Sequence, residues 1–95
     1  MKIQVVGMAW YRREDYDSIR QIMDDGKALP PVYDDWLAAA ERGFKKLTGD
    51  GLRIVRAEID PATFPAWCAT NGHKVNSDGR KAFANLRAFE SVHNN

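Results

Sequence analysis

The residues best suited to binding follow the two segments of the chain that are expected to form strands. Trp10, Tyr11, Arg12 and Arg13 come directly after the first segment, and Asp60 comes directly after the second. Open α/β sheets bind their ligands at the carboxyl ends of the strands. If the two strands are parallel, these turns meet and combine aromatic surface, two guanidinium groups and a carboxylate. This combination suits a small anionic ligand or a protein partner.

The same residues also have a purely structural interpretation. Trp10 and Tyr11 can belong to the hydrophobic core, where large aromatic side chains are often found. The two arginines can pair with the acidic residues that follow them, which are Glu14, Asp15 and Asp17. Most such charges are simply solvated or weakly paired. Both interpretations stay open on the sequence alone.

Cys68 and His73 are the pair to consider for nucleophilic catalysis, because a thiolate forms at neutral pH only beside a base or a positive charge. Their spacing is unfavourable. Five residues along a helix correspond to about 500° of rotation, so the two side chains point about 140° apart unless the helix breaks at Gly72. We therefore expect Cys68 to be a small buried thiol beside Trp67 rather than a reactive group.

The sequence has no spacing typical of a metal, nucleotide or cofactor site. Cys-x-x-Cys is absent, and His73 and His93 are twenty positions apart. The glycine-rich phosphate-binding loops are also absent. The aspartate pairs at 24–25 and 34–35 do not follow the pattern of a calcium-binding loop. We predict no catalytic residue, metal or cofactor. The pair at 34–35 suits a helix start, whereas the pair at 24–25 near a helix end has no electrostatic explanation.

Hydrophobic patterning predicts a strand over residues 3–10 and a second strand over residues 52–59. Two helices are expected between them. The first begins near Arg13, carries apolar residues at helical spacing and stops near Gly26. The second begins at Asp34 or Asp35, after a proline-containing link, and ends at the turn of residues 48–51.

Two further helices are expected after the second strand. One is capped by Asp60 or Thr63, has Pro65 in its first turn and stops at Asn71–Gly72. The other begins at Ser77 or Asp78. Its inner face is expected to consist of Phe83, Leu86 and Phe89. Its basic residues are expected to be mostly solvated, and these are Arg80, Lys81 and Arg87.

These elements predict a helix-rich α/β fold in a single domain over residues 1–95, in the order strand, helix, helix, strand, helix, helix. The long helical connection permits parallel strands. Two strands alone make a marginal sheet, whose outer edges present unpaired backbone donors and acceptors. We therefore predict a homodimer that either extends the sheet or covers it with helices.

The composition is that of a globular protein, with 44% hydrophobic and 28% charged residues in a chain of 95. The net charge of +1 gives no indication of nucleic acid or an acidic membrane as partner. Residues from Gly51 onward include six basic and four acidic side chains, so nucleic-acid binding is only a weak third alternative. A single cysteine favours a reducing cytoplasm. The first apolar stretch is too short for a signal peptide or a membrane span.

Several short strings are spread over most of the chain: Trp10-Tyr11-Arg12, Leu29-Pro30, Tyr33, Trp36-Leu37, Asp60-Pro61, Phe64 and Ala66-Trp67-Cys68. In these strings the chain resembles a family of small uncharacterised bacterial proteins. The resemblance implies a bacterial, cytoplasmic protein and supplies no activity, cofactor or site residue. The function expected from the residues is a non-enzymatic homodimeric module that binds a small anionic ligand or a protein partner at the strand ends. The alternative is a small enzyme that uses the same crevice.

Overall fold

The computed structural model describes residues 4–93, and the helices and strands of this part of the chain follow the predicted order. The fold is helix-rich α/β, as predicted. The predicted start of the first strand, at residue 3, lies outside the described residues. The elements are β1 (Val5–Trp10), the 3-10 helix η1 (Arg13–Asp15), α1 (Tyr16–Ile22), the 3-10 helix η2 (Gly26–Ala28), α2 (Tyr33–Gly49), β2 (Arg53–Glu58), α3 (Phe64–Thr70) and α4 (Ser77–His93).

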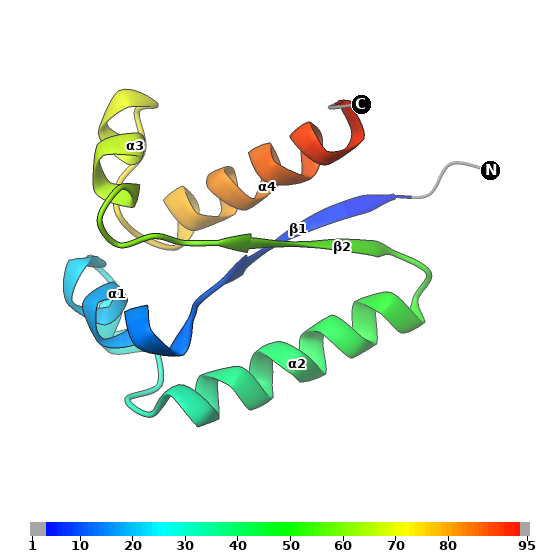
Figure 1. Ribbon diagram of the computed structural model, residues 1–95, viewed down its shortest axis with the longest axis horizontal. Helices are drawn as coiled ribbons and strands as arrows, with labels where there is room; N and C mark the ends of the chain where they lie inside the picture. Colours follow the sequence, from blue (N-terminus) through cyan, green and yellow to red (C-terminus); the bar gives the residue numbers. More distant parts are fainter. Residues whose placement is uncertain (1–3, 94–95) are drawn as a thin grey trace.

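The two strands run parallel and form the centre of three layers. Their register aligns Val5 with Arg53 at one end and Trp10 with Glu58 at the other. Helix α2 lies on one side of the sheet and α4 on the other, while α1 and α3 follow the carboxyl ends of β1 and β2 (Figure 1). The turns after the two strands therefore do lie at the same end of the sheet.

The α4 side of the sheet is built from small residues, which bring the helix close to the strands. Ala84 and Ala88 of α4 are buried, as is Ala57 of β2. A Cβ atom added to Gly7 would collide with the backbone carbonyl of Ala84. Glycine at position 7 is therefore required by the close approach of α4 to β1.

The predicted inner face of α4 is wrong at two of its three positions. Phe83 is buried, and its ring lies 5.1 Å from that of Trp67 in α3. Leu86 and Phe89, in contrast, are 38% and 60% exposed. The prediction placed the largest apolar residues against the sheet. The structure places alanines there because only short side chains fit between α4 and a strand that contains Gly7.

The α2 side of the sheet holds an aromatic core. The Trp10 ring packs edge to face against Trp36, with centroids 5.2 Å apart, and lies 6.5 Å from Phe44. Tyr11 lies 4.6 Å from Trp36 and 6.0 Å from Tyr16. Aromatic side chains bury the largest apolar areas of any residues, so this cluster contributes much of the stability available to a small domain.

The positions of Pro65 and Gly72 at the ends of α3 are as predicted, but the predicted cap is not: Thr63, the residue before the helix, makes no capping hydrogen bond through its side chain. Pro65 lies in the first turn, and Gly72, just after the helix, has a φ of 73°, the left-handed conformation that favours glycine. Among residues 4–93, no helix has the length and apolarity needed to cross a membrane.

Candidate functional site

The turn after β1 holds Arg12 at the surface. Arg12 has an extended backbone and precedes η1, which returns Asp15 toward its side chain. The Arg12 Nε donates a hydrogen bond to Asp15 Oδ2 at 2.9 Å, and Glu14 Oε1 lies 3.9 Å away. This hydrogen bond raises the pKa of Arg12. The guanidinium group is thus fully charged and already has a carboxylate partner.

Arg13 is also paired with a carboxylate, which comes from α2. Its guanidinium group lies 2.6 Å from Asp34 Oδ1 and 4.6 Å above the Tyr33 ring. The Tyr33 hydroxyl donates to the backbone carbonyl of Tyr11 at 2.8 Å, so the start of α2 is fixed to the turn after β1. Asp34, in the first turn of α2, therefore serves as a partner for this turn as well as for the helix dipole.

The two aromatic residues of the predicted site belong to the core. Trp10 and Tyr11 are 9% and 3% exposed. On the α2 side, the Arg56 guanidinium covers the Trp10 ring at 4.5 Å and the Phe44 ring at 4.2 Å. Burial raises the pKa of Tyr11 to about 12, so its hydroxyl is protonated throughout the physiological range. Neither ring is open to a ligand in this arrangement.

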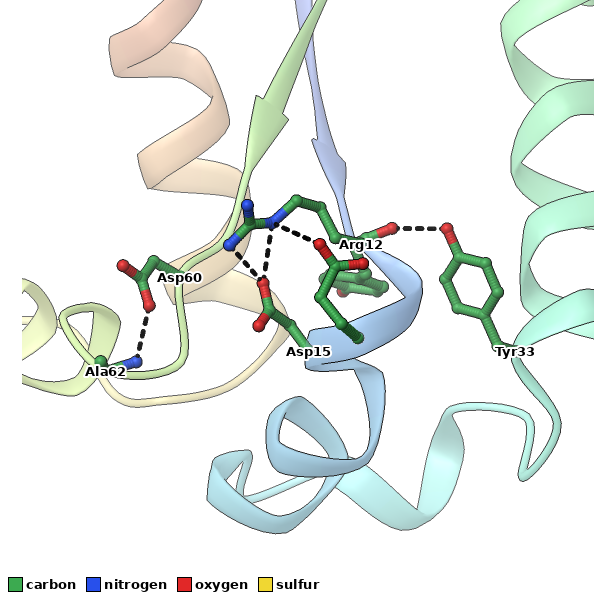
Figure 2. Close-up of polar contacts among 7 residues, drawn as sticks. Arg12, Asp15, Tyr33, Asp60 and Ala62 are labelled. Carbon is green, nitrogen blue, oxygen red and sulfur yellow. Dashed lines mark hydrogen bonds and ion pairs between the residues drawn. The ribbon is translucent and has the colours of Figure 1, made fainter.

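Asp60 lies at the same end of the sheet but has a different role. Its Oδ1 accepts a hydrogen bond from the Ala62 backbone N–H at 2.9 Å, which stabilises the turn that leads into α3. Figure 2 shows the Arg12 guanidinium directed at Asp15, while the Asp60 carboxylate is turned toward Ala62. No ion pair joins Arg12 to Asp60 within the part of the chain that the structure describes.

Negative charge is in excess at this end of the sheet. Two guanidinium groups, Arg12 and Arg13, stand against four carboxylates, which are Glu14, Asp15, Asp34 and Asp60. An anion would have to displace a carboxylate from either arginine. The small anionic ligand that the sequence predicts stays a prediction.

Cys68 has the environment of a structural thiol. It is fully buried, and burial raises its pKa, with a smaller contribution from the charge of Asp24. His73 does not activate it: the imidazole stacks on Trp67, at 5.5 Å and an interplanar angle of 12°. Within residues 4–93, no group of three or more His, Cys, Asp or Glu side chains is placed to hold a metal ion.

The least exposed ion pair among residues 4–93 was missed by the sequence analysis. Arg80 is 9% exposed rather than solvated, and its two terminal nitrogens donate to the two carboxylate oxygens of Asp25 at 2.8 and 3.0 Å. This bidentate pair lowers the pKa of Asp25. It also explains Asp25, one of the two aspartates near the end of α1, because this residue connects the loop after α1 to α4. Each residue looks solvated by local pattern, and only the tertiary fold brings them together.

Two grooves follow the edges of the sheet beside α4. A groove of about 480 Å³ lies along β2 and is lined by Arg56, Glu58, Arg87 and Glu90 together with smaller residues. The other, of about 320 Å³, lies along β1, where Gly7 and Ala9 form its floor. The α4 residues that line this second groove are Ser77, Arg80, Lys81, Ala84 and Asn85.

The candidate sites on the described surface are thus the strand ends and the grooves along the edges of the sheet. Comparison of the chain with models of protein families, with curated proteins and with solved structures finds no match, so the resemblance to a bacterial family stays a prediction.

Proposed function

We propose that this protein is a homodimeric, non-enzymatic interaction module. The observation that carries the proposal is the outer edge of β1. In residues 4–93 the sheet contains only β1 and β2, so each strand has one edge without a strand partner. Such an edge presents unpaired backbone groups that another chain can pair with.

The two edges differ in a way that favours β1 as the interaction surface. Natural proteins protect free edges with charged side chains. Strand β2 carries three exposed charged residues among its six, Arg53, Arg56 and Glu58. Strand β1 has the sequence VVGMAW and carries none. The charged side chains that would protect a free strand edge in a monomer are present on β2 and absent from β1.

The environments of the side chains that could take part in catalysis do not favour an enzyme. The buried thiol of Cys68 has a raised pKa, which disfavours the reactive thiolate. The raised pKa of Tyr11 keeps its phenol neutral inside the core. The arginines at the strand ends are held by carboxylates. These features fit a module that recognises partners.

Light scattering on the purified chain tests the proposal. We expect twice the mass of one chain at micromolar concentration, at both low and physiological salt, because the contact involves backbone and apolar groups rather than exposed charges. A chain that keeps the mass of a monomer up to about 100 μM would remove the proposal, since that concentration exceeds the dissociation constant of most specific dimers.

A further inference from the structure

We propose that the free edge of β1 binds an extended, acidic segment of a partner protein, which is added to the sheet as a third strand beneath α4. The inference rests on the proposed function of this edge as an interaction surface and adds the chemistry of the partner. Addition of a strand to an exposed sheet edge is a recurring mode of peptide recognition, in which backbone hydrogen bonds give affinity and side-chain pockets give specificity.

The N-terminal half of α4 covers the place of a strand that the sheet of residues 4–93 does not have. A Cβ atom on Gly7 would collide with the Ala84 carbonyl, so α4 lies directly over β1. A helix with its side chains is about 10 Å wide and strands are about 4.8 Å apart, so α4 extends over the neighbouring strand position on each side of β1. Strand β2 fills one of these positions, and the groove of about 320 Å³ lies at the other.

The backbone of β1 offers hydrogen-bonding groups to this empty position. The carbonyls of Gln4 and Trp10 accept hydrogen bonds at 3.0 and 2.9 Å from backbone N–H groups in β2 and directly after it. Backbone groups alternate in direction along a strand, so the even-numbered residues of β1 face β2. The N–H and carbonyl groups of Val5, Gly7 and Ala9 therefore face the free edge, where an added strand can pair with them.

The groove has room for the side chains of an added strand, and its wall can bind them. Gly7 and Ala9 form a floor without bulky side chains. The wall is one side of α4, where Ser77, Lys81 and Asn85 recur every four residues and so lie in a row. A hydroxyl, an ammonium and an amide group are thus available to polar side chains of the segment.

The charge of the groove favours an acidic segment. Two cationic side chains line it, Arg80 and Lys81, and no acidic side chain does. Arg80 is held by Asp25, whereas Lys81 is exposed and forms no ion pair with another residue of the described range 4–93. Strand β1 carries no charge of its own. An acidic side chain of the segment that faces α4 would therefore meet Lys81 as its counter-ion.

The groove along β2 is less suited to such a segment. Its lining includes two acidic residues, Glu58 and Glu90, and Glu90 already pairs with Arg87 at 2.9 Å. The exposed charges of β2 also protect that edge against an added strand. An acidic segment is therefore expected on β1 and not on β2, so β2 serves as an internal control.

Amide NMR with a synthetic peptide tests the inference. The probe is an acetylated peptide of about seven residues that alternates valine with glutamate, long enough to pair along the six residues of β1. We expect it to shift the amide signals of Val5, Gly7, Ala9 and Lys81 and to slow exchange of the three β1 amides at least about tenfold. The outward-facing amides of β2 are expected to stay unchanged. No response at about 1 mM peptide, or a response confined to β2, overturns the inference.

Two control peptides separate charge from backbone pairing. An analogue that alternates valine with lysine is expected to bind at least about tenfold more weakly, because it places like charge beside Lys81. A glutamate peptide with two adjacent prolines at its centre lacks backbone donors that a ladder needs, and it is expected to bind as poorly. Equal binding of the lysine analogue overturns the acidic partner, and equal binding of the proline analogue overturns strand addition.

Lys81→Met is the corresponding variant of the protein. Loss of one partly exposed ion pair is expected to weaken binding of the glutamate peptide by about two- to fivefold. Lys45→Met removes the same charge from an exposed position on α2 and is expected to leave the affinity unchanged. Equal affinities of the two variants for the peptide would contradict the contact with Lys81.

The outcomes for this inference and for the homodimer are distinguishable. A second copy and the peptide use the same edge, so saturating glutamate peptide is expected to lower the mass measured by light scattering from that of two chains to that of one. A dimeric mass in a chain that does not bind the peptide overturns the inference and leaves the homodimer standing. A monomeric mass of the free chain, together with the expected NMR response, overturns the homodimer and supports strand addition.

Discussion

Replacing Gly7 by alanine is expected to lower the free energy of unfolding by about 3 kcal/mol, at the upper end of the range for overpacked cores. The added methyl group would collide with the backbone carbonyl of Ala84, which cannot rotate away as a side chain can. Either α4 must move away from β1 or the strand must shift, and each response separates the alanines that fill this layer. Urea denaturation followed by circular dichroism measures the change.

Gly49→Ala is the matched control for Gly7→Ala. Gly49 is the last residue of α2, and a Cβ built there has no atom of the described residues within 4 Å. Alanine is expected to leave stability unchanged or raise it by up to about 1 kcal/mol. Both variants are measured at one protein concentration, because the stability of a dimer depends on it. Equal effects of the two substitutions would show that α4 does not approach β1 as closely as described.

Replacing Arg80 by methionine is expected to cost about 2 kcal/mol of stability at neutral pH. Loss of one partner from a buried ion pair leaves the other charge uncompensated. The expected cost is below the full value for a buried pair because the Asp25 side chain is 31% exposed. Lys45→Met is the control: Lys45 is exposed on α2, and its loss is expected to change stability by less than about 0.5 kcal/mol.

The effect of Arg80→Met is expected to depend on pH. The hydrogen bonds from Arg80 hold the pKa of Asp25 below its ordinary value of 3.8 in the folded protein. A carboxyl group with a lowered pKa stabilises the fold above its unfolded pKa, and this contribution is lost as the pH falls through the folded pKa. The stability difference between the unmodified chain and R80M should therefore be complete at pH 6 and shrink below about pH 4. A difference that stays constant down to pH 2 would assign the loss to packing of the Arg80 side chain.

Local patterns in the sequence were sufficient for the two strands, the four α-helices and their order, but not for the 3-10 helices η1 and η2, which occupy both ends of the helix predicted from Arg13 to Gly26. Apolar spacing predicted each helix, and Pro65 and Gly72 marked the ends of α3 correctly. Each of these signals acts within a few residues, because capping, turn geometry and helical periodicity are local. The sequence placed the turn residues together only on the condition that the strands are parallel, and the parallel pairing of β1 with β2 meets that condition.

The contacts that decide the chemistry of the site could not be predicted in this way. Arg80 and Asp25 are 55 positions apart, and nothing near either residue indicates the other. Arg13 pairs with Asp34 across 21 positions instead of with the acidic residues that follow it. The orientation of α4 depends on the space that Gly7 leaves at the sheet. All three are consequences of packing between distant elements.

The central claim is that the free edge of β1 is paired in solution, and hydrogen exchange at single amides tests it most directly. Alternation along the ladder turns the amides of Val5, Gly7 and Ala9 away from β2, and those of Ile54, Arg56 and Glu58 away from β1. If β1 pairs with a second copy, the β1 amides exchange at least about tenfold more slowly than the β2 amides, and dilution below the dissociation constant removes the difference. Equally fast exchange of both sets in a concentrated solution would contradict the account.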